Sequence, residues 1–220
     1  MPDATFNAIL GALPTLGRLN TIGTVITGYL GALKQVNAIS KLIKAWQREQ
    51  TEGSYVLDPV LGDDGRIYVD DKLVTAMRDR LLPLANFVTP NQFELELLSG
   101  QPVRDVPSAD NAAQHLLEQY HHLKGVLVTG VTHIDNSIHD RFISQTDLID
   151  MAYKKRTGGI AGGGDLLTTI FASWLASGHS FKNSFRAASA QAHSIIDRSN
   201  NHLEINLLEN MDQLKPIPRL

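Results

Sequence analysis

A glycine-rich segment leads directly into an aspartate within residues 157–174, TGGIAGGGDLLTTIFASW, where five glycines in eight residues precede Asp165 and an apolar helical pattern follows. Glycines let backbone N–H groups approach an anion, and the N-terminus of the following helix adds the positive end of its dipole. A carboxylate there would repel a phosphate unless it accepts a proton from the attacking group. Asp165 is therefore either a general base or a structural residue at a helix start.

Polar residues also follow the other predicted strands. Strands are predicted at 24–29, 55–57, 86–89 and 126–129, with an edge hairpin at 141–144 and 148–152. Helices are predicted at 36–47, 72–82, 92–98, 108–120 with Ser108 as N-cap, 165–177, 181–198 and about 202–214. This alternation favours a doubly wound, mostly parallel sheet, in which ligands bind beyond the carboxyl ends of the strands. The polar residues at those ends are Tyr29, Asp58, Asn91, Glu94, Thr129 and Asp165.

Two of these strand ends carry acidic groups with competing interpretations. Asp58 directly follows a buried strand, where an unpartnered carboxylate is costly, whereas Asp63 lies in a Pro and Gly turn where aspartate is common. Asn91 and Glu94 stand three residues apart at a helix start, which suits a capping box. The same pair suits a site that holds Mg²⁺ through water. Both interpretations of the pair can hold together.

Composition excludes several classes of function. The 220 residues contain no cysteine, which rules out disulfides, thiolate catalysis and cysteine zinc sites. A net charge of −3 gives no support for nucleic-acid or membrane binding, and a cytoplasmic location is the expectation. The eight histidines lack the spacing of a zinc hydrolase and are interpreted as surface residues. Lys154, Lys155 and Arg156 precede the glycine loop and could assist a phosphate, but a short basic run of this kind is more often simply solvated. Walker and GxGxxG motifs are absent.

Four motifs together resemble the vitamin B6 (pyridoxal/pyridoxine) kinases of the ribokinase-like superfamily. They are DPVLGDDGRIYV at 58–69, TPNQFELELLSG at 89–100, LVTG at 127–130 and GGGD at 162–165, with TGYLG at 27–31 before them. The resemblance implies one three-layer α/β domain over residues 1–220, with a mostly parallel sheet and helices on both faces. It also implies transfer of a phosphoryl group from ATP to the 5′-hydroxymethyl group of a B6 vitamer, in B6 salvage, by a homodimer.

The resemblance assigns roles residue by residue. Asp165 is the expected base at the vitamer, and the amides of Gly162, Gly163 and Gly164 form the expected anion hole. The residues expected at ATP are Asp58, Asp63, Asn91, Glu94, Thr129 and Gly130. The first four of these are also expected to bind Mg²⁺, partly through water. A monovalent cation is a further candidate cofactor. Tyr29 is expected against the vitamer ring and Tyr68 in a lid.

The sequence departs from the family pattern in two places. Gly163 occupies the position of a threonine in the usual GTGD loop, for which we expect reduced rather than abolished function. Relatives also carry a strand-helix-strand unit before the region that matches residues 6–19, with its first strand central in the sheet. We expect the fold to lack this unit, either because the chain is truncated or because its start codon is misassigned.

Two alternatives to a B6 kinase remain. A hydroxymethylpyrimidine kinase of thiamine synthesis belongs to the same superfamily, but those enzymes generally carry cysteine where this chain has Asp165. A non-catalytic homologue that binds nucleotide or pyridoxal phosphate is an alternative of a different class.

Overall fold

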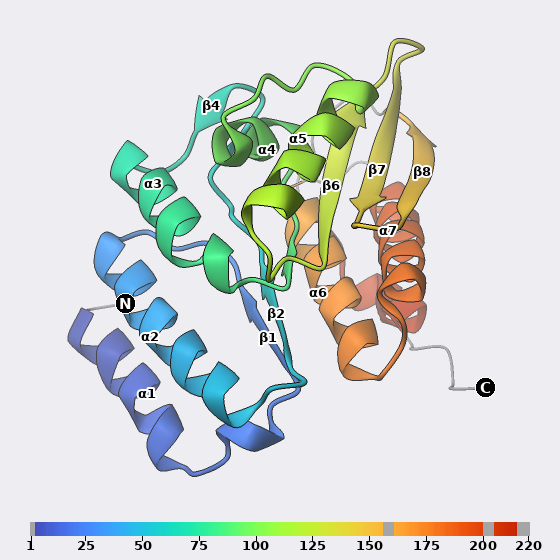
Figure 1. Ribbon diagram of the computed structural model, residues 1–220. Helices are drawn as coiled ribbons and strands as arrows, with labels where there is room; N and C mark the ends of the chain where they lie inside the picture. Colours follow the sequence, from blue (N-terminus) through green and yellow to red (C-terminus); the bar gives the residue numbers. More distant parts are fainter. Residues whose placement is uncertain (1–2, 156–160, 200–204, 215–220) are drawn as a thin grey trace.

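The computed structural model describes residues 3–155, 161–199 and 205–214. One sheet has the strand order β1-β2-β5-β6-β7-β8, and β3 pairs with β4 in a separate small hairpin (Figure 1). The strands are β1 (Thr24–Thr27), β2 (Ser54–Leu57), β3 (Gly62–Asp63), β4 (Arg66–Ile67), β5 (Phe87–Val88), β6 (Gly125–Thr132), β7 (Ser137–Ile143) and β8 (Leu148–Lys154). The pairs from β1 to β6 are parallel, and those that add β7 and β8 are antiparallel.

Helices lie on both faces of this sheet. The helices are α1 (Asp3–Thr15), α2 (Leu33–Glu49), α3 (Asp71–Arg80), α4 (Gln92–Ser99), α5 (Val106–Gln119), α6 (Gly163–Ala176) and α7 (Phe181–Arg198). Short 3₁₀ segments are η1 (Leu19–Thr21), η2 (Leu82–Leu84) and η3 (Leu208–Leu214). In Figure 1, α6 and α7 (orange and red) cover one face and the earlier helices (blue to green) the other. The predicted mostly parallel α/β architecture is confirmed.

Alternation along the strands divides the core into two layers. Tyr55 and Leu57 of β2 belong to the apolar cluster beneath α2 to α5, whereas Val56 between them belongs to the cluster beneath α6 and α7. Successive strand residues point to opposite faces, so a strand with helices on both sides is apolar throughout. This explains why a short run such as SYVL forms a buried strand although its sequence shows no alternation of apolar and polar residues.

Two expectations about individual elements are wrong, and two further elements were not expected. Ser108 is not an N-cap, because Asp105 takes that role and accepts a hydrogen bond of 2.9 Å from the Ser108 N–H. The helix expected at 202–214 is instead the 3₁₀ segment η3, irregular at Asn210, and residues 202–204 lie outside the described part. Helix α1 and the β3–β4 hairpin were not expected at all, since neither carries a clear periodic pattern over its length.

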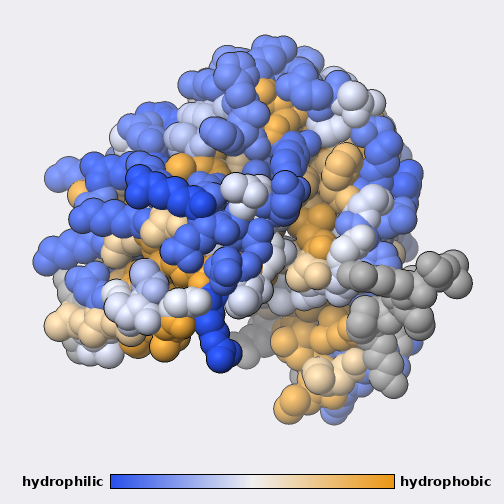
Figure 2. Space-filling model, turned by 60° about the horizontal axis from the view of Figure 1, so that its bottom comes forward, coloured by the Kyte–Doolittle hydropathy of each residue, from blue (hydrophilic) through white to orange (hydrophobic). Residues whose placement is uncertain are grey.

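At one margin of the sheet, β1 pairs with β2 alone among the described strands. Its Ile26 side chain is 40% exposed, and other apolar residues also reach solvent. Figure 2 shows apolar patches among hydrophilic side chains on the face that it presents. Within the described ranges no helix combines the length and the apolar character needed to cross a bilayer.

Candidate active site

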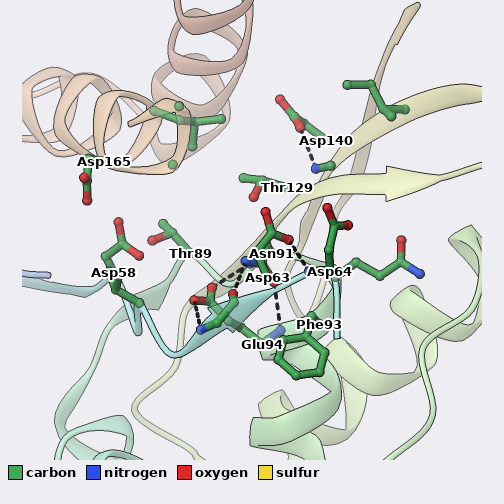
Figure 3. A pocket seen from close by; sticks show the side chains of 18 of the residues that line it. Asp58, Asp63, Asp64, Thr89, Asn91, Phe93, Glu94, Thr129, Asp140 and Asp165 are labelled. Atoms are coloured by element: carbon green, nitrogen blue, oxygen red, sulfur yellow. Dashed lines mark hydrogen bonds between the residues drawn. The ribbon is translucent and has the colours of Figure 1, made fainter. Parts of the chain in front are cut away.

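Polar residues from separate strand ends meet in one cleft of about 920 Å³. Figure 3 shows them facing a common space, with Asp165 on the helix side opposite Asp58. The predicted site residues that line it are Asp58, Asp63, Tyr68, Asn91, Glu94, Thr129, Gly130, Gly162, Gly163, Gly164 and Asp165. These residues span more than one hundred positions of sequence and converge because parallel strands end at the same edge of a sheet.

Asp58 is a buried carboxylate at the end of β2. Its Oδ2 accepts a hydrogen bond of 3.0 Å from the Thr168 hydroxyl, which is also 2.8 Å from the hydroxyl of Thr89. The pKa of Asp58 is raised to about 7 by burial first and then by the nearby carboxylates of Glu94 and Asp165, while the Thr168 hydrogen bond acts in the opposite direction. Without a cation, this group therefore holds a proton close to neutral pH.

Asn91 and Glu94 form the capping box at the start of α4, as one of the two interpretations predicted. The Asn91 Oδ1 accepts from the Glu94 N–H at 2.8 Å, and Glu94 Oε2 accepts from the Asn91 N–H at 3.0 Å. Glu94 also binds the segment after β2, because its Oε1 accepts from the Leu61 N–H at 2.7 Å and from the Gly62 N–H at 3.4 Å. The pair thus holds this segment in place, while Oε2 of Glu94 keeps a lone pair for water or an ion.

The β3–β4 hairpin forms one wall of the cleft. A Cβ atom at Gly62 would overlap the Arg66 carbonyl oxygen and the Phe93 ring, so this close approach requires glycine. Asp63 follows on the hairpin, and partial burial raises the pKa of its carboxyl. Tyr68 is 55% exposed and ends the hairpin with its N–H bonded to the Leu61 carbonyl at 2.8 Å. Tyr68 also lines the cleft, and its role in a lid stays a prediction.

The glycine loop presents the N-terminus of α6 to the cleft. Gly162 is the N-cap with a φ of 95°, a left-handed conformation that favours glycine. The first intrahelical bond runs from the Leu166 N–H to the Gly162 carbonyl, so the amides of Gly163, Gly164 and Asp165 have no partner within the helix. The three amides supply donors for an anion at this end of the dipole. Residues 158–160 of the loop lie outside the described part.

A buried network that the sequence analysis missed supports the opposite wall. Asp140 is 1% exposed, and its Oδ1 accepts from the Gly130 N–H at 3.1 Å. Its Oδ2 accepts from Ser189 at 2.8 Å and bonds with His193 at 3.0 Å. Gly130 has a φ of 67° and lies in the irregularity of β6 between Val128 and Val131. Nothing in the local pattern marks Asp140, since its partners are remote in sequence.

Tyr29 lies apart from the other predicted residues. Its side chain is 63% exposed and turns back toward Gly31 rather than lining the cleft. Gly28, one residue earlier, is the part of this strand end closest to the site, because a Cβ there would lie 3.9 Å from Asp165 Oδ1. Of the basic run, Lys155 lines the cleft, whereas Arg156 lies outside the described residues.

The charges of the cleft fit a divalent cation. Burial is the largest cause that raises the pKa values of Asp58, Asp63 and Glu94, and repulsion between carboxylates adds to it in each case. Oxygen donors in a water-accessible cleft are the ligands that Mg²⁺ prefers. A bound cation would remove this repulsion, so the residues present suit Mg²⁺ at this place.

Comparisons with known proteins identify the family of the chain. The profile of the family described as phosphomethylpyrimidine kinase matches residues 21–208. The chain is 30% identical over 193 residues to the pyridoxine/pyridoxal/pyridoxamine kinase of Bordetella avium, covering 86% of this chain and 64% of that protein. It spans about half the length of several other curated relatives that it matches.

Solved structures share the fold. Pyridoxal kinase from Entamoeba histolytica superposes with a TM-score of 0.89 at 25% identity, covering 98% of this chain and 77% of the other. Pyridoxal kinase from Leishmania donovani, in complex with ADP and pyridoxamine, gives a TM-score of 0.89 at 23% identity, covering 97% and 77%. The chain therefore belongs to the phosphomethylpyrimidine kinase family, and the resemblance to B6 kinases of the ribokinase-like superfamily is confirmed.

Proposed function

We propose that this protein transfers the γ-phosphoryl group of ATP to the 5′-hydroxymethyl group of a B6 vitamer. The observation that carries the proposal is the position of Asp165, which stands at the N-terminus of α6, beside free helix amides and opposite Asp58 in a single cleft. An anion site with a carboxylate at its mouth suits transfer to a hydroxyl, because the acceptor must lose a proton as it attacks.

In the proposed reaction the acceptor oxygen forms a bond to the γ-phosphorus while the bond to the bridging oxygen of ADP breaks. Asp165 accepts the proton of the hydroxyl. The amides of Gly163 and Gly164 donate hydrogen bonds to the phosphoryl oxygens, with Gly162 supplying the turn that aims them. Thr129, Gly130 and Lys155 line the cleft beyond them and are the proposed contacts of the remaining phosphates.

Mg²⁺ is the proposed companion of ATP. Asp58, Asp63, Glu94 and Asn91 would hold it, partly through water. The pKa values of the three carboxyl groups are raised by burial and by neighbouring carboxylates. When bound, Mg²⁺ supplies positive charge that offsets the charge of the phosphates. Glu94 and Asn91 position the wall residues Leu61 and Gly62 in either case.

A second candidate substrate is a hydroxymethylpyrimidine. It is favoured by the matching family profile, which is described as phosphomethylpyrimidine kinase. The chemistry at the hydroxymethyl oxygen would be the same, and the two candidates differ in the ring that packs at the Gly28 side of the cleft.

The experiment supplies the purified chain with ATP, Mg²⁺ and either pyridoxal or hydroxymethylpyrimidine. Pyridoxal phosphate is followed by absorbance and ADP release by a coupled assay. Asp165→Asn is expected to lower kcat for the preferred substrate by about 10²- to 10⁴-fold while the Tm stays within a degree or two. Asp79→Asn, an exposed aspartate on α3, is the matched control and keeps full activity.

Each outcome decides between the candidates. Turnover of pyridoxal alone supports the B6 assignment, and turnover of the pyrimidine alone supports the second candidate. Nucleotide binding without turnover of either substrate would favour a non-catalytic protein. An unchanged rate in Asp165→Asn would show that Asp165 is not the general base. A lower Tm with retained activity would show that Asp165 has a structural role at the start of α6.

A further inference from the structure

The turn between β6 and β7 brings two histidines and an aspartate together outside the cleft. His133 directly follows β6 and His139 lies in β7, and the His133 N–H donates to the Ser137 carbonyl at 3.0 Å. The turn closes with the Asn136 N–H bonded to the His133 carbonyl at 3.0 Å, with Asn136 at a φ of 64°. Asparagine tolerates this left-handed conformation well, so the local sequence itself favours the turn.

The donor atoms of this cluster lie within metal-binding range of one another. One side-chain donor from each of His133, Asp135 and His139 lies within 4.8 Å of the other two. The His133 Nδ1 and Asp135 Oδ1 atoms are 3.0 Å apart. Ligands about 2.0–2.1 Å from a tetrahedral ion are separated by about 3.3 Å, so small side-chain rotations would bring all three to that spacing. The expectation that the histidines are surface residues does not describe His139, whose side chain is largely buried.

A supporting shell orients the inner histidine. The His139 Nδ1 atom is 2.8 Å from Asp150 Oδ1, and Arg141 contacts the same Asp150 oxygen at 3.0 Å. Because a carboxylate only accepts, Nδ1 carries the proton and Nε2 presents its lone pair on the other side. The His139 side chain is 12% exposed, which limits its motion. A carboxylate behind a histidine in this way is the usual outer shell of a histidine metal ligand.

Ser137 lies between the prospective ligands. Its hydroxyl is 2.9 Å from His139 Nε2 and is also bonded to Asp135 Oδ1. Both ligand atoms are acceptors when Nε2 carries a lone pair, so the single hydroxyl hydrogen bonds to one of them at a time, and this hydrogen-bonded link holds the Ser137 oxygen between the two. A bound ion would replace that link, so Ser137 is not needed as a ligand.

We propose that His133, Asp135 and His139 bind a divalent transition-metal ion of the Zn²⁺, Co²⁺ or Ni²⁺ class. Imidazole nitrogen is a preferred donor for these ions, whereas Mg²⁺ selects oxygen and water. The site is therefore chemically distinct from the carboxylate cleft. It also adjoins that cleft, because Thr132 and Ile138 of the same hairpin line it and the Thr132 N–H bonds to Gln92 of α4 at 2.9 Å. An ion bound at the tip of the β6–β7 hairpin would restrain this wall of the cleft.

The test measures Co²⁺ and Zn²⁺ binding to the full chain after treatment with a chelator, in excess Mg²⁺ to block the carboxylate cleft. Co²⁺ absorption in the visible range and calorimetry with Zn²⁺ report stoichiometry and affinity. We expect one site, lost in His139→Ala and in His133→Ala. Asp150→Asn should weaken Zn²⁺ binding by about 10- to 100-fold, because it removes only the outer shell.

Two further variants separate a metal site from a hydrogen-bonded turn and from adventitious histidine binding. Ser137→Ala breaks the hydrogen-bonded link but keeps all three ligands, so it should bind Zn²⁺ at least as tightly. The double variant His121→Ala and His122→Ala removes two exposed histidines elsewhere and should bind as the parent does. Circular dichroism and Tm without metal establish that each variant folds. Binding that persists in His133→Ala with His139→Ala, or that disappears with His121 and His122, would overturn the proposal.

Discussion

Thr168 in α6 donates a hydrogen bond of 3.0 Å to Asp58 at the end of β2, although 110 positions separate the two residues. Thr168 is 1% exposed and its hydroxyl also contacts that of Thr89. The bond ties the helix that carries Asp165 to the strand end that carries Asp58. It also opposes the rise in the pKa of Asp58, which burial and the neighbouring carboxylates still bring to about 7.

Replacement of Thr168 by valine removes this bond without changing the side-chain shape. The pKa of Asp58 should rise by about one unit, since a hydrogen bond to a charged group is worth about 1.5 kcal/mol or more. The ionised form then requires a higher pH, so the acid limb of the kcat/KM profile should move up by about one pH unit. In Thr168→Ser the acid limb of the profile should stay at the pH found for the parent. The same is expected for Thr169→Val, which lies on the exposed side of α6. An unshifted acid limb in Thr168→Val would contradict this account.

Burial of Asp58 makes stability depend on pH. Its pKa is about 7 in the folded protein against 3.8 as the ordinary value, so the folded state binds the proton more tightly. The stability from this protonation is fully present below about pH 4 and is lost as the pH rises through about 7. Asp58→Asn should therefore raise the free energy of unfolding at pH 8, by about 4 kcal/mol, but not at pH 4.

Urea unfolding at the two pH values checks this, and Mg²⁺ provides the control. Added Mg²⁺ should raise the Tm of the parent at pH 8, and the rise should be smaller in Asp58→Asn because one carboxylate is gone. Equal stability gains at pH 4 and pH 8 would show that the substitution acts through packing rather than charge.

The two glycines Gly162 and Gly164 should respond differently to alanine. Gly162 has a φ of 95°, so a Cβ there strains the turn and should cost about 1 kcal/mol or more. At Gly164 a Cβ meets nothing within 4 Å, and alanine favours the helix, so stability should be kept or slightly raised. The new methyl group would project into the cleft and raise the KM for ATP. Thermal unfolding with initial-rate kinetics measures both, and equal stability losses would refute the assignment of strain.

Removal of the Asp140 carboxylate should destabilise the protein strongly. Asp140→Ala leaves the Gly130 N–H, Ser189 and His193 without their buried acceptor, which should cost about 3 kcal/mol. Ser189→Ala removes one donor to Asp140, together with the 2.8 Å bond to the Tyr153 hydroxyl, and should cost less, about 1 kcal/mol. Urea denaturation measures both, and because Gly130 lines the cleft, Asp140→Asn should also raise the KM for ATP. Similar small losses for Asp140→Ala and Ser189→Ala would show that the network contributes little.

Local interactions explain which elements could be predicted. Asn91 and Glu94 cap α4 within one turn, and Gly100 ends the same helix at a φ of 68°, so the signals lie within a few residues of what they control. Ser108 shows the limit of such signals. Both Asp105 and Ser108 are good caps, and the choice depended on a reciprocal pair of bonds between them rather than on residue type.

The sequence by itself determined the alternation of strands and helices, the chemistry at each strand end and the glycine turn before Asp165, because these follow from periodicity and backbone preference over short stretches. Tertiary structure alone decided which polar groups share a partner. Asp58 meets Thr168, Asp140 meets Gly130 and His193, and His139 meets Asp150 through contacts between separate elements. Such contacts depend on the register and packing of whole strands and helices, so no local pattern encodes them.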